Sequence, residues 1–132
     1  MNKIYVTGAD GMLGSAIVPL FRTAYEVRGT DLPEVDITDS DAIKTDITSF
    51  SPDIVIHLAS MTDVDRCETD PEAARRINAD GTGNVAAACA ECGATMVYIS
   101  TGMIYNGRKN GPYIEYDTPC LLYTSDAADE SS

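Results

Sequence analysis

The sequence has few basic residues, one histidine and no long apolar run. Nine Lys and Arg stand against 21 Asp and Glu, which gives a net charge of −12. This charge argues against nucleic acid and anionic membranes as partners, although a helix N-terminus can still bind an anionic ligand locally. No apolar run is long enough to span a membrane, and no basic-then-apolar leader opens the chain. We therefore expect a cytoplasmic protein.

Residues that bind metals are also scarce. His57 lies inside the apolar run 54–59, which favours a structural role over metal ligation. Cys89 and Cys92 form a C-x-x-C at the end of a predicted helix, but the four cysteines include no second such pair. We expect small buried thiols and no metal site.

The chain does contain a glycine-rich turn near its N-terminus. Residues 3–6 predict a strand, residues 15–18 predict the start of a helix, and Gly8, Gly11 and Gly14 lie between them. A strand, a glycine turn and a helix are the parts of a dinucleotide-phosphate site. Gly8 would allow a tight turn, Gly11 would leave room for a pyrophosphate, and Gly14 would let helix and strand pack closely. The spacing is G-x-x-G-x-x-G, not G-x-G-x-x-G, so the motif alone also fits an ordinary strand-to-helix turn.

An acidic residue follows at the distance expected for a ribose contact. Residues 25–31 predict a second strand that ends in Asp31, where dinucleotide-binding folds place a carboxylate on the adenosine ribose. The alternative is a solvated loop aspartate. Asp31 should accept from a free 2′-hydroxyl and repel a 2′-phosphate. Arg28 should point away from the site on strand alternation, so the sequence slightly favours NADH over NADPH.

The next segment, 34–39, follows the second predicted strand almost at once. The distance leaves no room for a full helix between the second and a third strand. Within it, Asp36 could accept from an adenine amino group while Ile37 packs on the ring. Earlier in the chain, Pro19 falls inside the first predicted helix. Proline there removes a hydrogen bond and costs about 3 kcal/mol, so we expect a kink or an early end near Val18.

The second half of the pattern continues the alternation of helices and strands. Asp39 or Ser40 should begin a helix, and residues 53–59 form the apolar run of a parallel strand covered on both faces. A long helix should run from Pro71 to about Glu91 and stop at Gly93, with Gly81 and Gly83 in close contact with the sheet. Residues 95–100 are the fifth strand in this count. The prediction is an α/β fold, a doubly wound parallel sheet of Rossmann type truncated after the fifth strand.

Several blocks in order resemble the extended short-chain dehydrogenase/reductase (NAD-dependent epimerase/dehydratase) family, and within it the dTDP-4-dehydrorhamnose reductases. These blocks are T-G-A-D-G-M-L-G, V-D-I-T-D, P-D-I-V-I-H-L-A-S, V-D-R-C-E, I-N-A-D-G-T-G-N-V and Y-I-S-T. The resemblance covers residues 1–119 and implies an incomplete dinucleotide-binding domain. It implies NAD(P)H-dependent reduction of a 4-keto nucleotide sugar in dTDP-rhamnose biosynthesis, and a homodimer of the full-length protein.

The resemblance also implies roles for individual residues. Asp31 would bind the ribose, Asp36 and Ile37 the adenine, and Thr101 the substrate carbonyl as the matching catalytic residue. The implied cofactor-binding residues are Gly8, Asp10, Gly11, Met12, Leu13, Gly14, Asp31, Asp36, Ile37, Ala59, Ser60 and Asn78.

The catalytic Tyr-x-x-x-Lys is not found where the family places it, roughly two dozen residues after Thr101. Tyr123 is the nearest tyrosine, and its partner four residues later is Ala127. We therefore expect the chain as written to be inactive. The family also continues with Asp and Tyr where this sequence has Gly102 and Met103. That departure keeps open a non-catalytic regulatory subunit, like the β subunit of methionine adenosyltransferase. Nucleotide-sugar epimerases and dehydratases share most of these blocks and are a further alternative.

The last residues resemble a translated laboratory sequence. Residues 120–130 match one reading frame of a transposase adapter used in DNA library preparation. We expect 120–132 to be a non-native tail, and the alternative is a genuine divergent C-terminus.

Overall fold

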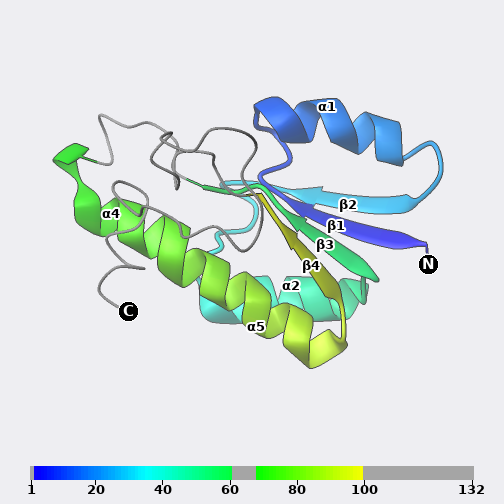
Figure 1. Cartoon of the computed structure of the whole chain (residues 1–132). Coiled ribbons are helices and arrows are strands. Elements are labelled where there is room, and N and C mark those ends of the chain that lie inside the picture. Colours follow the sequence, from blue (N-terminus) through cyan, green and yellow to red (C-terminus); the bar gives the residue numbers. More distant parts are fainter. Residues whose placement is uncertain (1, 61–67, 100–132) are drawn as a thin grey trace, which may run out of the picture. The chain divides into compact units, whose positions relative to one another are not determined.

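Four parallel strands form one sheet in a computed structural model of the chain, which describes residues 2–60 and 68–99 (Figure 1). The order across the sheet is β2-β1-β3-β4. Because β2 and β3 lie on opposite sides of β1, the chain reverses direction across the sheet beside the first strand, as predicted. The strands are β1 Lys3–Thr7, β2 Glu26–Thr30, β3 Ile54–His57 and β4 Thr95–Tyr98.

Helices cover both faces of this sheet, so the predicted doubly wound fold is confirmed (Figure 1). Helix α1, Met12–Phe21, lies on one face, and α2, Ser40–Phe50, lies on the other. A continuous helical segment follows β3. It consists of α4 Pro71–Arg75, the π-helical turn η1 Arg76–Gly81, and α5 Thr82–Cys92, and its last part, α5, packs beside α2. No helix in the described residues is long and apolar enough to cross a membrane.

Local sequence features set the helix ends. The Asp39 carboxylate accepts from the Ala42 N–H at 3.1 Å and caps α2. Asp70 caps α4 in the same way, and Pro71 follows at the start of that helix. Gly93 ends α5 with φ +74°, a left-handed conformation that favours glycine. The predicted helix starts and the predicted stop are therefore confirmed.

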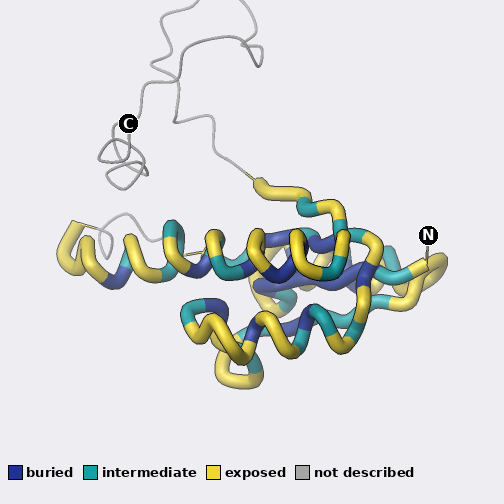
Figure 2. Tube along the Cα trace, turned by 90° about the horizontal axis from the view of Figure 1, so that it is seen from below, coloured by how far each residue is buried: buried dark blue, intermediate teal, exposed yellow. Residues whose placement is uncertain are grey.

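Strand alternation in β1 divides the core into two layers. The central strands are buried, whereas buried and exposed positions alternate along the helices (Figure 2). Tyr5 points to the side of α2 and α5, while Ile4 and Val6 point to the side of α1. Both layers are dry at their centres, since Tyr5 and Val6 have no exposed surface. The larger layer contains Tyr5, Ile37, Ile43, Ile47, Val55, Val85, Ala88 and Cys89.

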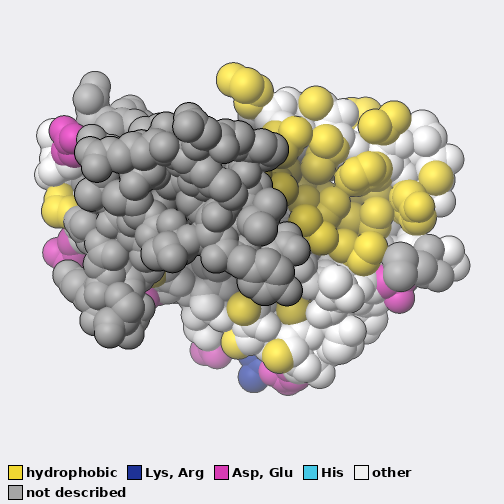
Figure 3. All heavy atoms as spheres, in the orientation of Figure 1, with side chains coloured by type: hydrophobic (Ala, Val, Ile, Leu, Met, Phe, Trp, Pro, Cys, Tyr) yellow, Lys and Arg dark blue, Asp and Glu magenta, His cyan; other side chains and the backbone are white. Residues whose placement is uncertain are grey.

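The sheet face beside α1 stays partly open to solvent over β3 and β4. Ile56 packs against the smaller layer and pairs with Val97 on β4, so the two side chains share this face. Val97 is 41% exposed and Ile99 is 50% exposed. Hydrophobic side chains gather on this side of the molecule, beside α1 (Figure 3).

Three details differ from the sequence-based predictions. Helix α1 continues through Pro19 to Phe21 and does not end near Val18. Segment 32–39 is a loop, so the described residues contain four strands and not the five of the earlier count. A Cβ on Gly83 would meet no atom within 4 Å, so Gly83 makes no close contact with the sheet.

Candidate functional site

The carboxyl ends of β1, β2 and β3 meet at one edge of the sheet. Thr7 pairs with Thr30 on one side and with His57 on the other, so the segments after these three strands leave the sheet together. Ligands of open α/β sheets bind at this edge, beside the strand where the order reverses. The structure therefore brings the glycine turn, Asp31 and Ala59 to one place.

Two of the glycines are required by the geometry of the turn. Gly8 has φ +67°, and a Cβ there would lie 2.6 Å from the Ala59 nitrogen. A Cβ on Gly14 would collide with the Gly8 carbonyl oxygen and approach the Ala9 Cα to 2.7 Å. The tight turn predicted from Gly8 is thus present, and Gly14 keeps the start of α1 against that turn.

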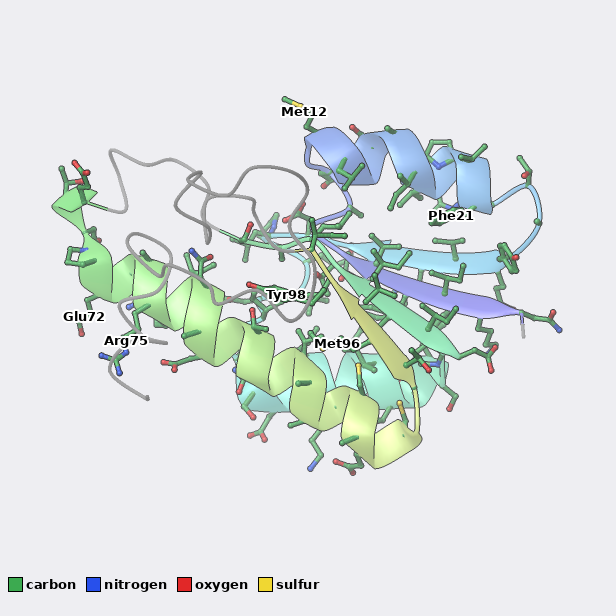
Figure 4. All side chains as sticks on the ribbon, in the orientation of Figure 1. Met12, Phe21, Glu72, Arg75, Met96 and Tyr98 are labelled. Atoms are coloured by element: carbon green, nitrogen blue, oxygen red, sulfur yellow. The ribbon has the colours of Figure 1, made fainter. Side chains whose placement is uncertain are left out.

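The first backbone N–H groups of α1 have no hydrogen-bond acceptor in the described part of the chain. Gly11 is the N-cap residue and provides no side-chain cap. No acceptor within the described residues 2–60 and 68–99 bonds the N–H groups of Met12, Leu13 and Gly14. The Met12 side chain is 94% exposed and projects from the helix start (Figure 4). Donors at a helix N-terminus, beside a backbone that lacks side chains, form a site suited to a phosphate.

Asp31 lies directly beside the turn. One of its carboxylate oxygens accepts from the Asp10 N–H at 3.1 Å, and the other accepts from the Leu32 N–H at 2.8 Å. Both bonds come from backbone, so the carboxylate is held in place while keeping lone pairs for further donors.

Arg28 is held away from Asp31, as strand alternation predicts. Its Nε and Nη2 donate to the two oxygens of Asp46, each at 2.8 Å. Nη2 also forms an ion pair with Glu34 at 3.2 Å. The guanidinium is therefore occupied on α2 and on the loop after β2, and does not contact the glycine turn.

The predicted adenine residues lie in the loop after β2. The Asp36 carboxylate accepts from the backbone and the hydroxyl of Thr38. The Ile37 side chain is only 7% exposed and packs on Gly81, where a Cβ would lie 2.6 Å from Ile37 Cδ1. Asn84 donates to the Ile37 carbonyl at 2.9 Å. Most of the Ile37 surface is used inside the protein, and contact with adenine stays a prediction for both residues.

The remaining predicted residues are only partly covered by the structure. Ala59 and Ser60 follow β3 at the ligand edge, and Asn78 lies in η1, partly buried. A π-helical turn is often found at functional sites, because the extra residue redirects neighbouring side chains. Thr101 and the tail 120–132 lie outside the described residues.

Sequence analysis missed a buried polar cluster beneath the turn. Thr7 Oγ1 lies 2.7 Å from His57 Nδ1, and His57 Nε2 lies 2.9 Å from Thr82 Oγ1. Burial lowers the pKa of His57 to about 4, so the ring is neutral at physiological pH. The predicted structural role of His57 is confirmed. Thr7 and His57 are polar residues at the ends of two apolar strands, β1 and β3. This unusual placement is the sequence feature that would have revealed Thr7 as the partner of His57.

The cysteines behave as expected in the described region. Cys89 is buried, and that burial raises the pKa of its thiol to about 11. Cys92 is free and partly buried. No cluster of metal-binding side chains occurs among residues 2–60 and 68–99.

Strand order, glycine turn and ligand edge together define a Rossmann-type α/β fold. More narrowly, the chain belongs to the family described as the RmlD substrate binding domain, which matches residues 1–124.

Individual relatives agree with this assignment. The dTDP-4-dehydrorhamnose reductase of Aggregatibacter actinomycetemcomitans is 32% identical over 98% of this chain and 45% of its own length. The β subunit of methionine adenosyltransferase 2 from Pongo abelii is 33% identical over 92% of the chain and 38% of its own length. A crystal structure of Bacillus anthracis dTDP-4-dehydrorhamnose reductase with NADP superposes with a TM-score of 0.89 at 32% identity, covering 99% of this chain and 48% of that one. The chain thus spans about half the length of these relatives or less.

Two sequence details qualify the earlier expectations. The family match extends past Pro119 to residue 124 and so includes the first residues of the predicted tail. A tyrosine and a lysine four apart do occur, at Tyr105 and Lys109, but only four residues after Thr101 and not two dozen. Both lie outside the described residues.

Proposed function

We propose that residues 1–119 bind NAD(P)H and belong to a protein that reduces a 4-keto nucleotide sugar. The observation that carries the proposal is the geometry of the turn. Gly8 and Gly14 close it tightly, and the N–H groups that begin α1 are left without acceptors in the described part of the chain. Family membership and the NADP bound by the Bacillus anthracis relative support the same cofactor class.

The chain's own residues would divide the work of holding the cofactor. The start of α1 would bind the pyrophosphate, Asp31 the adenosine ribose, and Ala59 and Ser60 would lie along the cofactor toward the substrate. When bound, NAD(P)H supplies the hydride for the ketone carbon. Thr101 would donate a hydrogen bond to the substrate carbonyl oxygen, and protonation of that oxygen needs a stronger acid than a threonine hydroxyl.

Replacing Gly11 by valine tests the pyrophosphate site. The new side chain would stand at the exposed N-cap of α1, where the phosphates must approach, and we expect NADH affinity to fall at least about tenfold, or 1.4 kcal/mol. Fluorescence titration of NADH measures the effect. Gly83→Ala is the matched control, since Gly83 has open space around it on α5. Equal affinities for wild type and Gly11→Val would exclude the assignment.

We further propose a preference for NADH over NADPH. Asp31 lies where a 2′-phosphate would bring like charge, and Arg28 is bonded to Asp46. At about 4 Å such repulsion is worth about 1 kcal/mol in water, so Asp31→Ala should shift the NADH/NADPH affinity ratio about fivefold toward NADPH. Glu26→Ala, at the other end of the same strand, should leave the ratio unchanged. A wild-type preference for NADPH that Asp31→Ala leaves unaltered would contradict the proposal.

A second candidate is a non-catalytic dinucleotide-binding subunit. The similarity to the methionine adenosyltransferase β subunit and the presence of Gly102 and Met103 where reductases have Asp and Tyr favour it. The natural codons after Pro119 distinguish the two candidates. A Tyr-x-x-x-Lys about two dozen residues after Thr101 supports the reductase, and its absence supports the subunit.

A further inference from the structure

The outer face of α1 is apolar although it faces solvent. Helix α1 contains no charged residue, whereas α2 and α5 both contain charged residues. Val18 is buried in the core on the inner side of α1. Met12 and Leu20, in contrast, are 94% and 64% exposed. A helix on the surface of a protein carries polar side chains on the face that meets water, so the outer face of α1 lacks the pattern of a free surface.

The exposed apolar residues line up along one side of the helix. Met12, Ala16 and Leu20 are spaced by four residues, and Pro19 lies beside them on the same side. All four residues are exposed. The Met12 side chain points away from the sheet (Figure 4), and hydrophobic side chains gather along α1 on the surface (Figure 3). We call these four residues the α1 stripe.

The two ends of α1 carry opposite charges. Asp10 precedes the helix and Arg22 follows it directly; both are exposed, and neither forms an ion pair within residues 2–60 and 68–99. Ala16 lies midway between them in the sequence. In an antiparallel pair of α1 helices centred on Ala16, Met12 of each copy would face Leu20 of the other. Each Arg22 would approach the Asp10 of the other copy, and the opposed helix dipoles would add to the attraction.

We propose that the α1 stripe is the contact between two copies of this chain, related by a two-fold axis beside Ala16. Such a contact uses the same surface on both copies and closes after two of them, so the chain forms a dimer and no larger assembly. This inference goes beyond the proposed cofactor site. The N–H groups at the start of α1 point along the helix axis, whereas the stripe lies on the side of the helix, so pairing leaves the phosphate site open.

A second copy matches this surface better than a membrane does. The chain has a net charge of −12 and the stripe contains no Lys or Arg, so nothing attracts it to anionic lipids. The same net charge makes two copies repel each other, and a charge-free contact with opposite charges at its rim is where they meet with least repulsion. A helix of 10 residues is about 15 Å long, so the contact is small, and we expect a weak dimer that is half-formed at about 100 µM protein.

Sedimentation of the 132-residue chain in the analytical ultracentrifuge, from about 5 to about 500 µM, tests the dimer. The mass should rise from the 14.1 kDa of one chain toward twice that value. Leu20→Glu puts a carboxylate at two symmetric positions in the contact and should raise the dissociation constant at least about tenfold. Leu32→Glu is the matched control, because it makes the same change at a residue that is 61% exposed on the loop after β2. It should stay within about twofold of wild type.

Charge reversal tests the antiparallel arrangement and does not depend on Leu20. Arg22→Glu should raise the dissociation constant at least about fivefold, since an attraction of about 1 kcal/mol at about 4 Å becomes a repulsion in both symmetric pairs. Adding Asp10→Lys restores opposite charges and should return the constant to within about twofold of wild type. A parallel pair would bring the two Arg22 side chains together and would show neither the loss nor the rescue.

Three results would overturn the proposal. The first is a wild type that stays monomeric at about 500 µM, and the second is growth beyond the dimer, because a two-fold contact closes. The third is association that Leu20→Glu leaves intact and Val97→Thr removes, which would place the contact on the exposed face of β4. None of these results depends on cofactor binding, so the proposed function stands or falls separately.

Discussion

Asp46→Ala will lower the free energy of unfolding by about 2–3 kcal/mol, because it removes the shared acceptor of a partly buried network. Asp46 Oδ2 accepts from the Tyr5 hydroxyl at 2.5 Å and from Arg28 Nε at 2.8 Å, while Oδ1 accepts from Arg28 Nη2. Tyr5 is completely buried, so its hydroxyl cannot turn to water instead. Arg28 is 35% exposed, and solvent compensates part of its loss.

Urea denaturation checks this value, with Asp41→Ala as the control from an exposed position in the first turn of the same helix. The control should stay within about 0.5 kcal/mol of wild type. An equally small effect of Asp46→Ala would show that the network contributes no net stability.

The pH dependence of stability shows how the charge of Asp46 contributes to the free energy of unfolding. Burial alone would raise the pKa of Asp46, but the hydrogen bonds from Arg28 and Tyr5 outweigh it and hold the pKa below its usual value. A carboxylate with a lowered folded-state pKa contributes stability above its unfolded pKa of about 3.9 and loses it as the pH falls. The difference between wild type and Asp46→Ala should therefore shrink below about pH 4.

The sequence predicted the sheet well because apolar runs of strand length alternate with segments of helix length. The apolar runs of β1 and β3, the cap at Asp39 and the stop at Gly93 are local features, and each acts where it stands in the chain. The predicted helix end near Val18 was wrong because tertiary contacts can outweigh the free-energy cost of a proline inside a helix. Val18 and Phe21, on either side of it, both pack against β1 and β2.

Contacts between distant segments could not be predicted in the same way. The burial of Ile37 depends on Gly81, which lies 44 residues further along the chain, so the residues of the loop 32–39 alone do not indicate it. Buried hydrogen bonds join Thr7, His57 and Thr82, and no local spacing connects these residues. For the site, the glycine turn and Asp31 were predictable because family motifs fix them.

The 132-residue chain will not reduce a 4-keto nucleotide sugar at a measurable rate. Hydride transfer to a ketone builds negative charge on its oxygen, and a positioned acid contributes about 10²- to 10⁴-fold to such a step. The family's Tyr-x-x-x-Lys is missing at its expected place, and the Thr101 hydroxyl is too weak an acid to replace it. The chain also spans less than half of the length of these curated relatives.

The assay follows NADH and NADPH consumption with dTDP-4-dehydrorhamnose, and the full-length Aggregatibacter actinomycetemcomitans reductase serves as the positive control. We expect a rate below about 10⁻² of that control, given the loss of the acid alone. Measurable turnover would contradict the prediction. In that event Tyr105→Phe decides whether the pair Tyr105 and Lys109 supplies the proton despite its unusual position.

The cause of the expected inactivity has its own test, because we propose that residues 120–132 are not native. Amplifying the source DNA again and reading past codon 119 should give a different sequence, with Tyr-x-x-x-Lys near position 125 and a long continuation, as the coverage of the relatives implies. The family match extends to residue 124 and so includes Cys120 and Thr124, which belong to the proposed non-native tail. Sequencing the source DNA is therefore necessary. If the DNA instead confirms Leu121, Leu122 and Tyr123 followed by a stop after Ser132, the tail is genuine. The chain would then have no catalytic acid at the family's position, and dinucleotide binding without catalysis, as in a regulatory subunit, would become the better account of its function.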